Sequence, residues 1–148
     1  PSLWPLLRCL AVADQESGNR ERAADRYADA FDDLCAERRD HGASWTAATA
    51  ALGRETIEAL LAVGRTAQAR AVWDRLLPGI RERGRFRLVE AGLLLAEGRR
   101  EEALDVFRAG FEVADLREGT DTVSRLWSRL TDEPLPAHYD FRMRPPEG

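Results

Sequence analysis

The sequence predicts an all-α fold, a superhelix of about three antiparallel helix hairpins with a C-terminal capping helix and an extended tail. Two observations carry this prediction: a short residue pattern recurs three times, and each copy lies within a series of apolar residues at helical spacing. A chain of 148 residues can bury one core but not two. We therefore expect a helical domain over residues 1–131 and a docked tail over 132–148.

The recurring pattern is a glycine, an alanine five residues later and an aromatic residue four further on. The three copies are Gly18, Ala23 and Tyr27; Gly64, Ala69 and Trp73; and Gly98, Ala103 and Phe107. Glycine ends a helix cheaply in the left-handed conformation, alanine lets a neighbouring helix approach closely, and the aromatic ring fills the gap between helices. Each copy therefore predicts the turn and the second helix of a hairpin.

The first helices of the hairpins are expected at about 3–17, 44–63 and 85–97. They should bury Leu6, Leu7 and Leu10; Trp45, Leu52, Ile57 and Leu60; and Leu88, Leu94 and Leu95. The second helices carry stripes that must also be buried. These stripes are Ala23, Tyr27, Ala30, Phe31 and Leu34; Ala69, Val72, Trp73, Leu76, Leu77 and Ile80; and Ala103, Val106, Phe107, Gly110 and Ala114.

A last helix is predicted after Gly119, because apolar residues return at helical spacing there. They are Val123, Leu126, Trp127 and Leu130. A stack of hairpins exposes an apolar face at its end, so we expect this helix to serve as a cap.

The tail cannot continue that helix, because Pro134 and Pro136 break it. Beyond them Tyr139, Phe141 and Met143 alternate with charged residues, which is the period of an extended segment with one apolar side. We expect that side to dock on the helices or on a preceding domain.

The threefold pattern resembles the tetratricopeptide family, over roughly residues 3–114. Gly64 and Gly98 lie 34 residues apart, the repeat length of that family, whereas the 46 residues from Gly18 to Gly64 indicate an insertion near residues 37–43. The resemblance implies a concave groove, lined by the first helices, that binds peptides. The groove residues it implies are Arg8, Val12, Gln15, Arg54, Glu58, Leu61, Leu88, Gly92 and Leu95. Val12 and Glu58 stand where chaperone-binding members carry asparagine, which disfavours a chaperone-tail receptor.

The ending Pro-Leu-Pro, His-Tyr-Asp-Phe-Arg-Met is similar to the end of some bacterial proteins in which a mutarotase-like β-sandwich precedes helical repeats. It covers about the last 17 residues and implies a larger protein with a carbohydrate-related region. This leaves open a second interpretation, an accessory helical domain of a carbohydrate-active enzyme with an exposed aromatic platform. A scaffold instead predicts Trp45, Trp73 and Trp127 buried.

Composition and charge limit the classes of partner that the chain is expected to bind. The net charge of −4 disfavours nucleic acid, which needs a basic surface. No run of about 18 apolar residues could span a membrane, and residues 3–12 do not form a signal peptide. We therefore expect a cytoplasmic protein. All 22 basic residues are arginine, which is typical of G+C-rich bacterial genomes. Because the chain starts at Pro1 without methionine, we expect a fragment of a larger protein.

No catalytic, cofactor or metal site is predicted. His41 and His138 have no metal-ligating neighbour at helical spacing. The carboxylates of residues 25–37 alternate with arginines and are typical of a solvated ion-pair face. Cys9 and Cys35 are expected to be small buried thiols without a disulfide.

An arginine cluster surrounds Gly84. Its members are Arg81, Arg83, Arg85 and Arg87. Both an anion or acidic-peptide site and a charged loop neutralised by Glu82 and Glu90 remain open. Taken together, these patterns favour a non-catalytic protein–protein interaction scaffold. Its groove should hold a protein, a peptide or a neighbouring domain of the same chain.

Overall fold

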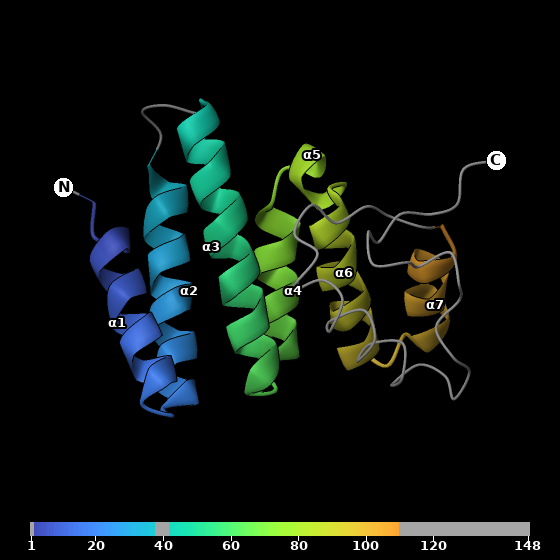
Figure 1. Ribbon diagram of the computed structural model, residues 1–148, viewed down its shortest axis with the longest axis horizontal. Coiled ribbons are helices and arrows are strands. Elements are labelled where there is room, and N and C mark those ends of the chain that lie inside the picture. The colour runs from blue at the N-terminus through green and yellow to red at the C-terminus, as the bar shows by residue number, and fades with distance from the viewer. Residues whose placement is uncertain (1, 38–41, 110–148) are drawn as a thin grey trace. The chain divides into compact units, whose positions relative to one another are not determined.

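The computed structural model describes residues 2–37 and 42–109, and the described residues form helices and no strands (Figure 1). The all-α prediction is confirmed. The chain divides into two compact units, residues 1–76 and residues 77–148. The predicted capping helix at 123–130, the tail at 132–148, His41, His138 and Trp127 lie outside the described residues.

The first unit contains four helices that pack in chain order. They are α1 (Trp4–Glu16), α2 (Arg20–Ala36), α3 (Ala43–Ala62) and α4 (Thr66–Arg75). Figure 1 shows each beside the next, and α2 and α3 each have a helix on either side. The core of this unit lies between them, around Phe31, Leu34, Leu52, Ile57 and Leu60, each at most 1% exposed.

The second unit contains three described helices: α5 (Pro78–Arg81), α6 (Gly84–Ala96) and α7 (Arg100–Ala109). Helices α6 and α7 pack on each other as a hairpin. Phe107 of α7 and Leu93 of α6 are fully buried.

The three hairpin turns have one and the same backbone design, and the glycine prediction is confirmed. Gly18, Gly64 and Gly98 have φ of +85°, +77° and +78°. After each glycine, the next N–H donates to the carbonyl five residues back, at 2.8–2.9 Å, while the glycine N–H donates three residues back. This is the Schellman motif, which satisfies carbonyls at a helix C-terminus and which glycine fits without strain.

The alanine and aromatic positions of the pattern are buried as predicted. Ala23, Ala69 and Ala103 are at most 2% exposed, and Tyr27, Trp73 and Phe107 at most 3%. The helix starts predicted at 44 and 85 agree with α3 and α6 to within one residue.

The predicted second stripe does not lie on one helix, because α4 ends at Arg75. Leu76 and Leu77 are extended, with ψ of 144° and 142°, and Pro78 opens the separate short helix α5. A residue before proline is driven out of the helical region, which explains the break. As a result Leu77 is 46% exposed, although Leu76 and Ile80 are buried.

The predicted core of the first helix is also wrong. Leu6 and Leu10 are 59% and 36% exposed, and the buried residues of α1 are Ala11 and Asp14. The predicted burial of the thiols is wrong for Cys9, which is exposed, and Cys35 is only half-buried. Neither cysteine forms a disulfide. Alanine rather than leucine lies against α2, which lets the two helices approach closely.

Gly53 of α3 lies against the side chains of Phe31 on α2 and of Leu76, the residue that follows α4. A Cβ atom at Gly53 would lie 2.7 Å from Cδ2 of Leu76 and 3.2 Å from Cε1 of Phe31. The glycine therefore makes room for the side chains that close the core of the first unit.

Candidate functional site

The nine residues implied as a groove are shared between the two units. Arg8, Val12 and Gln15 lie on α1 and Arg54, Glu58 and Leu61 on α3, whereas Leu88, Gly92 and Leu95 lie on α6 of the second unit.

The α1 group is joined to α3 by a bidentate ion pair. Arg8 Nε donates to Glu55 Oε1 at 2.9 Å, and Arg8 Nη2 donates to Glu55 Oε2 at 2.8 Å. The side chains are 42% and 19% exposed. This hydrogen bonding raises the pKa of Arg8, so the guanidinium stays charged. Glu55 was not among the implied groove residues, although it lies one position beyond Arg54.

The hydroxyl of Tyr27 reaches the same face from α2. It donates to Gln15 Oε1 at 3.3 Å, while the Tyr27 side chain is almost fully buried. Burial raises the pKa of Tyr27, the charges of Glu55 and Glu58 raise it further, and Arg8 opposes them. These polar groups of α1 and α3 therefore gather around one phenol, and we call Arg8, Gln15, Tyr27, Glu55 and Glu58 the Tyr27 cluster.

The α3 group extends the cluster along its helix. Arg54 and Glu58 form an ion pair at 3.4 Å, one turn apart, with side chains 23% and 56% exposed. Leu61 is half-buried, as is Val12 on α1. The first unit thus brings all six of its implied groove residues to partly accessible positions on α1 and α3.

The α6 group differs. Leu88 is 4% exposed and presents almost no surface, whereas Gly92 and Leu95 are half-buried. A partner could contact Gly92 and Leu95 without any change in the core of the second unit. Contact with Leu88 would require such a change.

The arginine cluster around Gly84 is partly neutralised. Arg87 Nη1 lies 3.1 Å from Glu90 Oε1, as the charged-loop interpretation expects. Arg83 is exposed, and Arg81 is half-buried, with its Nε covered and without a hydrogen-bond partner.

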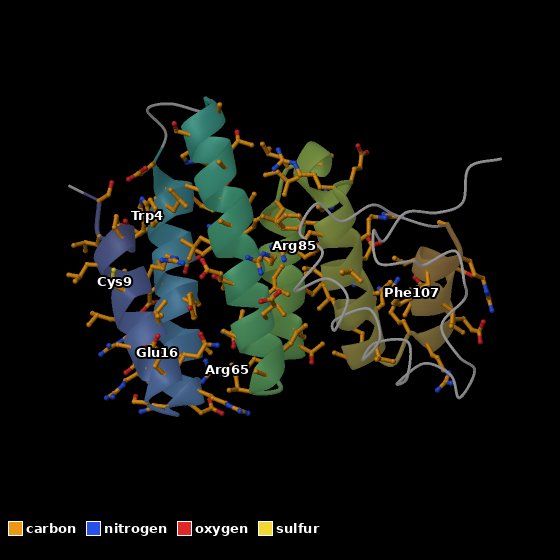
Figure 2. The ribbon with its side chains drawn as sticks, viewed as in Figure 1. Trp4, Cys9, Glu16, Arg65, Arg85 and Phe107 are labelled. Atoms are coloured by element: carbon orange, nitrogen blue, oxygen red, sulfur yellow. The ribbon has the colours of Figure 1, made fainter. Side chains whose placement is uncertain are left out.

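The carboxylates of α2 pair mostly between elements rather than within the helix. Arg65, after the α3–α4 turn, binds both Glu21 and Asp25, and Arg75 at the end of α4 binds Asp32. Figure 2 labels Arg65 near the end of α3. Asp25, Asp29 and Asp32 of this acidic face are exposed, as predicted, whereas Asp33 and Glu37 are half-buried.

The arginines of α2 instead reach Asp14 on α1. Arg22 Nε lies 3.0 Å from Asp14 Oδ1 and Arg26 Nη1 lies 3.1 Å from Asp14 Oδ2. The Asp14 side chain is only 6% exposed, so it needs both partners, because a buried charge is costly unless it is paired. Sequence spacing does not reveal this pairing, since the residues lie on different helices.

Metal-ligating clusters and exposed aromatic rings are the features that a metal centre or a sugar platform would need. In residues 2–37 and 42–109, no group of three or more His, Cys, Asp or Glu could hold a metal ion. Every Phe and Tyr of these ranges and Trp73 are buried, and Trp4 and Trp45 are half-buried. Trp45 Nε1 donates to the Leu34 carbonyl at 3.2 Å.

Comparison with protein-family models, curated proteins and solved structures finds no match to this chain. Across the described part of the chain, no helix has the length and apolarity needed to cross a membrane.

Proposed function

We propose that this chain is a non-catalytic protein–protein interaction scaffold built of tetratricopeptide-like helix hairpins. The partner segment binds along α1 and α3 of the first unit. The observation that carries the proposal is the Tyr27 cluster, which gathers polar side chains of α1, α2 and α3 on one accessible face. Val12 and Leu61 flank this cluster with half-buried apolar surface.

The hairpins support the proposal because they are rigid. Three identical Schellman turns and buried alanine–aromatic pairs set the geometry of each hairpin. Helices held this way present surface side chains in fixed positions, so a partner does not have to order them on binding.

The state of the charged groups indicates what kind of segment fits. Arg8 and Arg54 are each already paired with a glutamate on this face. An acidic ligand would have to displace Glu55 or Glu58. A nearly neutral segment can instead accept hydrogen bonds from the remaining N–H groups of Arg8, which is 42% exposed. Its apolar side chains can pack on Val12 and Leu61.

The same contacts argue against acid–base chemistry in the cluster. The pKa of Tyr27 is raised by burial, so its hydroxyl is protonated at neutral pH and donates to Gln15. Both carboxylate oxygens of Glu55 already accept hydrogen bonds from Arg8, so a substrate would have to compete with Arg8 for them. Neither group is held ready to act on a substrate.

Charge reversal on the face tests the proposal. The tagged full chain, Glu58→Arg and Asp29→Arg are used to capture proteins from bacterial extract, and the captured proteins are quantified by mass spectrometry. Asp29 is an exposed carboxylate on α2 away from the cluster, so the two variants have the same net charge.

We expect Glu58→Arg to lose at least one partner that the parent chain and Asp29→Arg retain. Both variants should keep the helical circular dichroism of the parent. Identical partner profiles for the parent chain and Glu58→Arg would overturn the assignment of this face.

A further inference from the structure

We draw no further inference here: the strongest candidate, the side-chain cluster of Arg81, Arg83, Arg85 and Arg87 at the N-terminus of α6, carries no proposal, because Arg87 is paired with Glu90 and the unpartnered Nε of Arg81 belongs to a residue that is only half-buried, so that in the described residues nothing beyond the helix N-terminus points to a bound anion.

Discussion

Single side chains in the first unit link helices that are far apart in sequence. Arg8 and Glu55 lie 47 residues apart, and Arg65 joins Glu21 and Asp25 across at least 40. Asp33 caps the start of α1 from α2. Arg8 links α1 to α3 and Arg65 links the start of α4 to α2, so these pairs hold together helices that are not consecutive in the chain.

These links could not be predicted from the sequence. Charge alternation along α2 indicated an exposed ion-pair face, and that face exists, but the choice of partner depends on the rotation of each helix about its axis. Asp14 shows this best: its spacing does not distinguish it from a surface aspartate, yet two arginines of the next helix enclose it. Likewise Glu55 was not predicted as a groove residue, because the family resemblance implied its neighbour Arg54 instead.

Ionisation of Tyr27 gives a test of the cluster at alkaline pH. Burial and the glutamates raise the pKa of Tyr27 above its ordinary value of 10.0. The folded state therefore holds the phenol proton more tightly than the unfolded chain. Its contribution to stability is complete below pH 10 and is lost as the pH rises from there through the folded-state pKa.

Tyr27→Phe removes both this titration and the hydrogen bond to Gln15. At pH 7 the variant should lose about 1 kcal/mol in the free energy of unfolding, measured by urea denaturation. Its stability should then fall less steeply than that of the parent above pH 10, so that the gap narrows. Cys35, whose pKa burial also raises, is unchanged in both chains and cancels in the comparison. Parallel stability curves from pH 9 to 11 would contradict the assigned pKa shift.

At the level of elements, the hairpin turns were the most predictable part of the fold. Glycine at a helix end, followed by alanine and an aromatic residue at fixed spacing, specifies both the chain reversal and the side that is buried. The rotation of α1 about its axis could not be predicted, because Leu3 at its N-cap and Leu6, Leu7 and Leu10 in the helix make more than one side of it apolar. Only the position of α2 decides which side becomes core. Pro78 was a visible signal for the end of α4, but the continuing apolar series outweighed it.

The left-handed turns can be tested with one pair of glycines. Neither Gly64 nor Gly79 has any atom within 4 Å of an added Cβ, but only Gly64 has a positive φ. Gly64→Ala should therefore cost about 1 kcal/mol of unfolding free energy from backbone strain alone. Gly79→Ala should be neutral or slightly stabilising, because alanine favours the helix.

Gly64→Asn provides the internal control, because asparagine tolerates the left-handed conformation better than alanine does. We expect it to recover part of the loss, as measured by thermal unfolding under the same conditions. Equal losses for Gly64→Ala and Gly79→Ala would mean that the turn geometry does not limit stability.

At the scale of the molecule, the first unit has what an independent domain needs. Its four helices pack consecutively, and its core draws on each of α2, α3 and α4. About 60 residues are enough for many domains to fold alone, and residues 1–76 exceed that length. The described hairpin α6–α7 is too short for this on its own, since chains below about 40 residues usually need a disulfide, metal or partner.

We therefore predict that a chain of residues 1–76 folds by itself. Its far-UV circular dichroism should be strongly helical, and it should unfold in a single cooperative thermal transition. Cutting at Leu76 keeps that buried side chain beside Gly53, whereas a chain of residues 1–72 loses both Trp73 and Leu76 from the core. The shorter chain should be markedly less stable, since each lost core side chain costs several kcal/mol, on the order of 2–5. A non-cooperative or unfolded 1–76 chain would show that the first unit depends on residues beyond it, and equal stability of the two chains would show that Trp73 and Leu76 do not close its core.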